Sequence, residues 1–555
     1  MESRRPNDIL HLNVKAELRF DSRRSPVFAT RGMVATSQPL AAQAGIEILA
    51  QGGSAADAAV ATAAALNVTE PTSTGIGGDC FLLYYEGASK QVLAYNGSGR
   101  APAGLSLERL AREGFSGGIP PFHPHTITVP GACDGWCRLI ERHGRLSLAE
   151  VLGPAIRLAE QGFPVSPITA DSWQSGVDRQ LNQALGGREL TIDGRAPRAG
   201  ELFRNPGLAR TLQAVAVGGS DAFYQGEIGR AIAQVVQAAG GVLSESDLAE
   251  HHGEWVDPIS GPFRGYQVWE APPNSQGLAV LLALNLLEGF ELAELQPLGP
   301  ARLHLILESL RLAFADARQY VADPEFAPAP LDELLSKSYA AARRTLIDPS
   351  RATLDQSVGQ LAEASDTVYL TTVDSQGNAC SFINSNYMGF GTGIVPAGWG
   401  FTLQNRGLGF SLDPDHPNRL APRKRPYHTI IPGMVTRPDG SLFASFGVMG
   451  GFMQPQGQVQ VLIGLIDDNL DPQAALDCPR VCLTTAAPGS PVALEEGIPE
   501  ESLEQLRAMG HSVEFVRGSA RAIFGRGQII QRDPESGVLS GGSDPRADGC
   551  ALPLV

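Results

Sequence analysis

The sequence predicts a layered α/β protein in which helices cover β-sheets. Small and aliphatic residues recur with helical spacing in several stretches before about residue 320. Short runs of aliphatic and aromatic residues flank turn sequences near residues 80–95 and 368–383. Apolar residues make up 43% of the 555 residues and charged residues only 18%, below the usual content of about 25%. The chain can therefore bury a large core.

The N-terminal elements follow from local signals. Residues 1–30 carry frequent charges and no apolar run, so we expect a disordered extension there. Residues 39–50 have helical spacing, and two glycines then end that helix. Ser54 begins a second helix, because Asp57 three residues later completes a capping box. The run AAVATAAALNV that follows is small and apolar enough to require burial.

Further elements can be placed in the same way. The runs CFLLYY and QVLAY, separated by residues 86–89, predict a β-hairpin. A second capping box at Ser147 starts a helix that Gly162 ends. Helical patterns return at 228–239 and from 302 to about 318.

A second hairpin is expected after residue 367. Val368–Val373 and Ala379–Ile383 flank the turn sequence DSQGN. With a two-residue turn, Thr367 faces Asn386, and with a three-residue loop it faces Ser385. Thr367 therefore lies beside one of these residues at the open end of the hairpin.

Charge and composition exclude several classes of protein. The formal net charge of −16 gives no electrostatic drive toward nucleic acid or an anionic membrane, so we expect neither as a partner. No apolar run reaches the length of a transmembrane helix, and no signal peptide is evident. Seven cysteines, an odd number with no CxxC spacing, fit reduced thiols in a cytoplasmic protein.

No cofactor signature is present. His123 and His125 flank a proline without a third ligand nearby and are expected in a surface turn. The glycine-rich segment 389–393 lacks the Lys-Ser/Thr of a P-loop, and no GxSxG motif occurs. We therefore expect no metal and no organic cofactor.

Five segments, in order along the chain, carry a family resemblance. They are GGSAADAAVATAAALNVTEPTSTGIGGD, ISGPFRGYQVWEAPPNSQG, DTVYLTTVDSQGNA, GFGTGIV and SDPRADG. Together they resemble the γ-glutamyltranspeptidase family over nearly the whole chain. The resemblance implies an α/β fold, a four-layer αββα sandwich of the N-terminal nucleophile hydrolase type.

The resemblance also implies a proenzyme. Family members cut themselves before a threonine, which here is Thr367, so the cleavage site is the Asp366–Thr367 bond. The implied products are a large subunit, 31–366 after the extension, and a small subunit, 367–555. The two chains would form a heterodimer that remains one interwoven domain. The freed α-amine, with a pKa of about 7.7 to 8.0, can take the proton of the Thr367 hydroxyl.

Two supporting roles follow from the matching positions. Gly450-Gly451 matches the family's oxyanion hole, in which backbone amides stabilise the tetrahedral intermediate. Ser385 occupies the position of a threonine that supports the nucleophile, in agreement with the hairpin count.

The substrate-binding positions depart from the family. The family's carboxylate-binding arginine falls on Ser98, and Arg100 two residues later is the candidate replacement. An asparagine becomes Tyr387, and the family's glutamine and aspartate that contact the substrate ammonium become Arg406 and Gly409. Losing that acid removes the natural partner of an ammonium group.

The paired serines that bind the substrate carboxylate in the family become His428 and Thr429, both able to donate hydrogen bonds. The first expectation is therefore a small-molecule γ-glutamyl substrate, such as glutathione, with acyl transfer to water or an amine. Two alternatives stay open: an acylase for glutaryl-like amides, and an unprocessed, inactive homologue that binds a metabolite.

Overall fold

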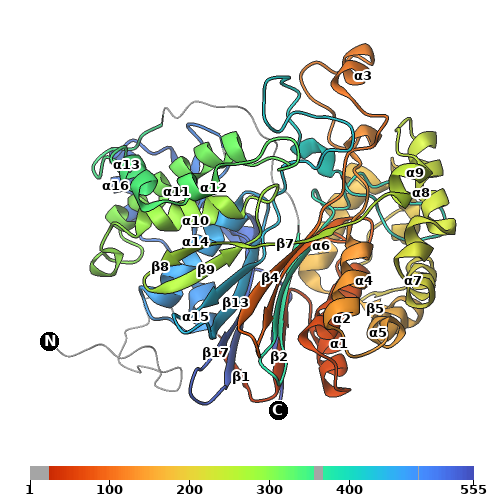
Figure 1. The fold of residues 1–555 in the computed structure, drawn as a ribbon, viewed down its shortest axis with the longest axis horizontal. Coiled ribbons are helices and arrows are strands. Elements are labelled where there is room, and N and C mark those ends of the chain that lie inside the picture. The colour runs from red at the N-terminus through yellow and green to blue at the C-terminus, as the bar shows by residue number, and fades with distance from the viewer. Residues whose placement is uncertain (1–23, 355–366, 486) are drawn as a thin grey trace.

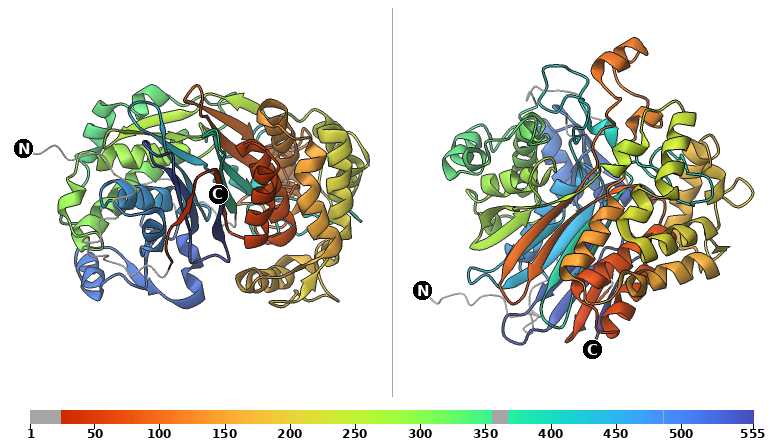
Figure 2. Two further views of the ribbon diagram at one scale, coloured as in Figure 1. Left: turned by 90° about the horizontal axis from the view of Figure 1, so that it is seen from below. Right: turned by 45° about the vertical axis from the view of Figure 1, so that its right-hand side comes forward.

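Two seven-stranded β-sheets lie face to face at the centre of the molecule, and helices cover the outer side of each (Figure 1). The computed structural model describes residues 24–354, 367–485 and 487–555. Seen from below, the four layers follow one another across the molecule (Figure 2). The predicted αββα arrangement is confirmed.

The first sheet holds the strand that follows Thr367. Its strands, in spatial order, are β19 (Cys550–Leu554), β2 (Gly32–Thr36), β10 (Val368–Val373), β11 (Ala379–Ser385), β3 (Asp79–Glu86), β4 (Gln91–Gly97) and β7 (Glu254–Val256). All six residues of β10 are buried, because sheet and helices cover both of its faces. Thr367 thus immediately precedes a central strand.

The second sheet packs on the first through its inner face. Its order is β1 (Val27–Ala29), β18 (Leu539–Ser543), β17 (Arg526–Arg532), β13 (Leu442–Met449), β12 (Gly433–Thr436), β9 (Tyr266–Glu270) and β8 (Ile259–Phe263). Residues 1–23 lie outside the described residues, but β1 corrects the expected boundary at residue 31. Its three residues pair antiparallel with β18, a partner more than 500 positions away that local patterns could not reveal.

One helical layer covers the outer side of the first sheet. The helices that contact its strands are α1 (Pro39–Ala50), α2 (Ala55–Thr69) and α4 (Ala132–His143). Further out, α5 (Leu148–Gln161), α7 (Pro206–Tyr224) and α8 (Glu227–Ala238) pack against these helices or against one another. Every residue of α2 is buried, and the helix contacts β10 and β11. The capping boxes predicted at Ser54 and Ser147 are both formed.

The other helical layer covers the second sheet with longer aliphatic side chains. It contains α10 (Gly277–Leu287), α11 (Pro300–Tyr320), α14 (Met453–Ile466) and α15 (Pro472–Asp477). The remaining helices are α3 (Leu107–Arg112), α6 (Pro167–Gly176), α9 (Glu245–Ala249), α12 (Leu331–Leu334), α13 (Lys337–Arg344) and α16 (Glu500–Ala508).

Two smaller sheets complete the fold: β5 (Phe163–Pro164) with β6 (Leu202–Phe203), and β14 (Val481–Leu483) with β15 (Val492–Glu495) and β16 (Val513–Val516). All seven cysteines are free, as expected. Among the helices that the structure describes, none is both long enough and apolar enough to cross a membrane.

Candidate active site

Thr367 lies beside Ser385 at the open end of the β10–β11 hairpin. Val368 pairs with Asn384 and Val373 with Ala379, a register that sets residue 367 opposite residue 385. The three-residue-loop alternative is therefore the correct one. Thr367 Oγ1 and Ser385 Oγ are 3.1 Å apart, and both residues are fully buried. The other half of the predicted cleavage site, Asp366, lies outside the described residues.

The end of β13 faces Thr367 across the two sheets. Thr371 Oγ1 donates a hydrogen bond of 2.6 Å to Ser445 Oγ. Two residues earlier on β10, the ring of Tyr369 packs against Gly447, where an added Cβ would lie 2.4 Å from the ring. The facing residues thus move two positions back along β10 for every two positions forward along β13. The next pair in this series is Thr367 and Met449, the last residue of β13.

Gly450 and Gly451 therefore lie at the Thr367 end of the facing sheet, between β13 and the first turn of α14. Both have positive φ, 124° and 61°, which favours glycine. No hydrogen-bond acceptor for either amide is found among the described residues. Free amides before the N-terminus of a 14-residue helix, where the helix dipole is positive, can stabilise an oxyanion.

A buried guanidinium contacts Ser385 from the other side. Arg406 begins the short 3-10 turn Arg406–Gly409, and it donates hydrogen bonds to Ser385 Oγ (3.1 Å) and Thr429 Oγ1 (2.8 Å). Its Nε has no partner, and no carboxylate of the described residues lies within salt-bridge distance. Burial lowers the pKa of Arg406 to about 10, so it stays charged at neutral pH.

Tyr387 supports this cation. Its φ of 77° is in the left-handed region, which is unusual for a bulky residue and marks a constrained backbone. The Tyr387 amide donates to Ser385 Oγ (2.9 Å), and the guanidinium carbon of Arg406 lies 4.4 Å from the centre of the Tyr387 ring. This contact is a cation–π interaction, which holds the guanidinium in place.

His428 pairs with an aspartate to which the sequence analysis gave no role. His428 Nε2 donates to Asp79 Oδ2 (3.0 Å), and its Nδ1 accepts from the Ile430 amide (3.4 Å). Burial and Arg406 hold the pKa of His428 well below its ordinary value. Burial also raises the pKa of Asp79 to about 7, although Arg406 and the Gln404 side chain oppose the rise. The imidazole is thus neutral.

Asp79 was missed because its partners are far apart in sequence. Its Oδ1 accepts from Gly99 N (3.0 Å), Gly131 N (3.1 Å) and Gln404 Nε2 (2.9 Å). The segment TGIGGD carried the family resemblance, and its conspicuous acidic end was the available signal.

Arg100 lies in a different setting. Its guanidinium pairs with Glu254 (3.2 Å) and Glu325 (3.0 Å), at the wall of an open cavity of about 560 Å³. Two carboxylates already balance its charge. Arg406 is therefore the cation in contact with the residues around Thr367.

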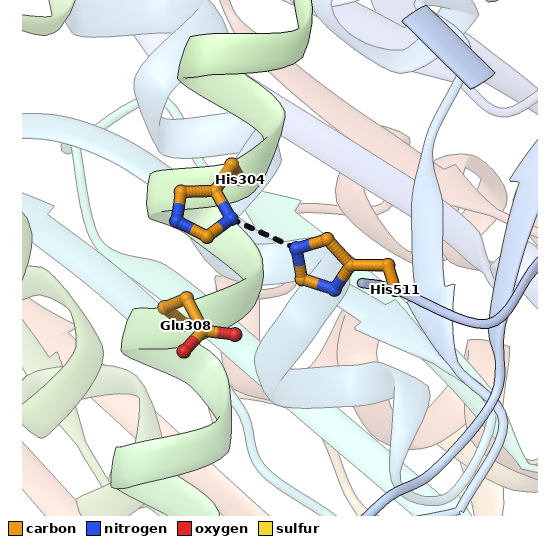
Figure 3. Close-up of side chains that lie close together, drawn as sticks. All are labelled: His304, Glu308 and His511. Atoms are coloured by element: carbon orange, nitrogen blue, oxygen red, sulfur yellow. Dashed lines mark hydrogen bonds between the residues drawn. The ribbon is translucent and has the colours of Figure 1, made fainter. Parts of the chain in front are cut away.

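A separate cluster joins α11 to the turn after α16 (Figure 3). The ligand atoms of His304, Glu308 and His511 lie within 4.8 Å of one another, close enough to hold a metal ion. However, His304 Nε2 donates to the Asp348 carbonyl (2.8 Å), so its Nδ1 accepts from His511 Nε2 (2.8 Å). Arg311 lies 3.5 Å from Glu308 Oε1. The paired imidazoles and this nearby cation disfavour a metal ion.

Comparisons with known proteins give matches over nearly the whole chain. A family model described as Gamma-glutamyltranspeptidase matches residues 41–554. The glutathione hydrolase-like YwrD proenzyme of Bacillus subtilis (strain 168) is 38% identical over 95% of this chain and 99% of its own length. The acylase ACY 1 proenzyme of Pseudomonas sp. (strain SE83) is 34% identical over 96% of each chain. Cephalosporin acylase from Bacillus halodurans superposes with a TM-score of 0.89 at 45% identity, covering 97% of this chain and 98% of that one.

Proposed function

Because the chain belongs to the γ-glutamyltranspeptidase family of N-terminal nucleophile hydrolases, we propose that it cleaves itself before Thr367 and then hydrolyses or transfers acyl groups from γ-glutamyl amides. The observation that carries the proposal is the placement of the Thr367 hydroxyl. It lies 3.1 Å from Ser385 Oγ, at the start of a central strand and opposite the end of β13, which Gly450-Gly451 follow.

Self-cleavage converts one peptide bond into two chain ends. The Thr367 oxygen attacks the carbonyl carbon of Asp366, and its proton passes to the amide nitrogen as the C–N bond breaks. The resulting ester links Asp366 to the Thr367 side chain. Water then opens the ester, leaving a carboxylate on residue 366 and an α-amine on Thr367. The large chain would span residues 1–366 and the small chain residues 367–555.

The new α-amine acts as general base in the acyl-transfer reaction. It takes the hydroxyl proton as Thr367 Oγ1 attacks the substrate amide carbon, and the leaving amine receives that proton when the C–N bond breaks. We assign to the amides of Gly450 and Gly451 the role of donors to the oxyanion, an interaction whose removal costs about 10²–10³ in rate in other enzymes. Water or an acceptor amine then attacks the acyl-enzyme ester.

Ser385 assists the attack by Thr367, because two N–H groups already donate hydrogen bonds to the Ser385 hydroxyl oxygen. Tyr387 N and Arg406 Nη2 donate to Ser385 Oγ, which makes its own proton available to Thr367 Oγ1 as negative charge develops there. This role is one of positioning and polarisation, since Ser385 acts through Thr367.

A second candidate function is favoured by Arg406. Its guanidinium is fully buried and makes its two hydrogen bonds to neutral hydroxyl groups, on Ser385 and Thr429, so it can pair with the carboxylate of an incoming acyl group. The position that is acidic in the family is Gly409, which offers no partner for an α-ammonium group. These features suit a dicarboxylic acyl group without an α-amine, as in glutaryl amides.

Two measurements test the proposal. Intact-mass spectrometry of the purified protein should show a small chain that begins at Thr367, whereas Thr367→Ala should remain one chain of 58.7 kDa. A wild-type protein that stays uncut would instead support the unprocessed, metabolite-binding alternative. Side-by-side assays with γ-glutamyl and glutaryl anilides then separate the two enzymatic functions, since faster turnover of the glutaryl compound would favour the acylase.

We also propose a cytoplasmic location. The seven free cysteines support it, since thiols persist in a reducing compartment. Cell fractionation with an antibody to the small chain tests this, and recovery in a secreted fraction would contradict it.

A further inference from the structure

Two arginines on one face of α11 are buried together, and the described acids near them balance only one of the two charges. Arg311 and Arg318 are 6% and 5% exposed, and with Phe314 they line one small cavity. Phe314 is three residues after Arg311 and four residues before Arg318, so all three side chains lie on the same side of the helix. The other walls are Thr353, Leu354, Leu483 and the turn 487–489.

The guanidinium groups have donors to spare. Nε and Nη1 of both arginines are buried and have no hydrogen-bond partner. Arg311 uses Nη2 to reach the Ser490 carbonyl (3.1 Å), whereas Arg318 donates to no group in the described part of the chain. A buried polar group without a partner is costly, and a bound water or ion is the usual explanation for one.

The nearby acids balance one of the two charges. Glu308 Oε1 lies 3.5 Å from Arg311 Nε, and its other oxygen accepts from Thr353 N (2.9 Å). Asp316 is held by Arg343 through both carboxylate oxygens, at 2.8 and 3.2 Å. The imidazoles beyond Glu308 add no negative charge. Among the residues that the structure describes, one buried positive charge therefore has no matching acid. Water alone could satisfy its N–H groups but could not neutralise it.

We propose that Arg311 and Arg318 bind one small inorganic anion of the size of chloride. The cavity volume of about 10 Å³ is close to the minimum for one water-sized particle, which favours a small ion over a large organic acid. The walls come from both sides of Thr367, since residues 311–354 precede it and Leu483 and residues 487–489 follow it, so the anion would hold the two proposed chains together. This inference does not depend on the proposed reaction.

The first test is direct observation of the ion. Crystals of the wild-type protein grown in sodium bromide should give an anomalous peak at the bromine edge within about 3.5 Å of the guanidinium nitrogens of Arg318. A water molecule, a carboxylate of this chain, or bromide found only elsewhere on the protein would each overturn the proposal. This measurement needs no variant, so it stands even if substitutions prevent folding.

The second test is the stability of the protein in different anions. Replacing 0.2 M sodium chloride with 0.2 M sodium gluconate, whose anion cannot enter the cavity, should lower the wild-type melting temperature by about 2 °C. In Arg318→Gln this anion effect should disappear. In Arg230→Gln, which alters an exposed arginine of α8, it should persist. Equal anion effects in all three proteins would show general salt action and refute the site.

Discussion

Replacing Arg406 with glutamine tests how the site recognises its acyl group. The substitution removes the buried positive charge beside Ser385 but keeps a side-chain donor. If the substrate carboxylate pairs with Arg406, at least one charge-assisted hydrogen bond of roughly 1.5–3 kcal/mol is lost. At about 3 kcal/mol, kcat/KM for glutaryl or γ-glutamyl anilides should fall by about 100-fold.

The same substitution should spare uncharged donors and the fold. For butyryl anilide, which has no carboxylate, we expect a change of less than about 5-fold, because hydrogen bonds to Ser385 and Thr429 can be kept. Arg406 holds down the pKa of Asp79, which is about 7 in the wild type. Without the cation that pKa rises further, so Asp79 binds a proton at neutral pH and no unpaired charge is left buried.

The assay is steady-state hydrolysis of the three anilides, with cleavage into two chains checked first on a denaturing gel. Arg100→Gln is the matched control, because Glu254 and Glu325 already balance that arginine. Equal losses of activity on charged and uncharged donors, or a larger loss in Arg100→Gln, would refute the assignment of Arg406.

Four further predictions can be checked separately. Thr367→Ala should abolish both cleavage and activity, while Thr367→Ser should still be cut; mass spectrometry detects either failure. Ser385→Ala should reduce kcat by about 10-fold, the equivalent of one hydrogen bond of roughly 1.4 kcal/mol, and an unchanged kcat would remove Ser385 from the mechanism. Burial raises the pKa of Glu70 from 4.5 to about 7, so its folded form keeps a proton that the unfolded form releases; stability is therefore lost as the pH rises from about 4.5 to 7. The melting temperature of wild type relative to Glu70→Gln should fall between pH 5 and pH 8, and a constant difference would contradict the assigned shift. Arg546→Ala should lower the free energy of unfolding by about 1.5–3 kcal/mol, because Glu495 and Asp544 lose charge-assisted hydrogen bonds while Arg521 and Arg480 remain as their partners. A loss below about 0.5 kcal/mol in denaturant titration would be inconsistent with these pairs.

Sequence reasoning located the parts of the site that depend on short-range geometry. Counting residues outward from the turn of the hairpin placed Thr367 beside Ser385, because the register of paired strands sets which residues face each other. The family resemblance supplied Gly450-Gly451, and the facing register of β10 and β13 brings that pair to the end of the sheet where Thr367 lies.

Long-range pairings could not be predicted in this way. Asp79 and His428 are 349 residues apart, and only the folded sheets bring them together. His304 and Glu308 are four residues apart on one helix and were visible in principle, but His511 was not. Arg100 was a reasonable substrate cation by position, yet its two acidic neighbours lie more than 150 positions away.

The order of strands in the two sheets limits what the protein can do after cleavage. In the first sheet β10 and β11 stand between β2 and β3, and in the second sheet β12 lies beside β9 and β18 beside β1, so neighbours come from opposite sides of Thr367. A cut would leave the two chains interleaved, and neither could separate without breaking the hydrogen bonds of central strands. Once the cut protein is denatured, refolding would require two separate chains to associate and form the strand pairs between them again. We therefore expect the uncut precursor to refold readily and the mature enzyme to persist by slow unfolding, a kinetic rather than an equilibrium stability.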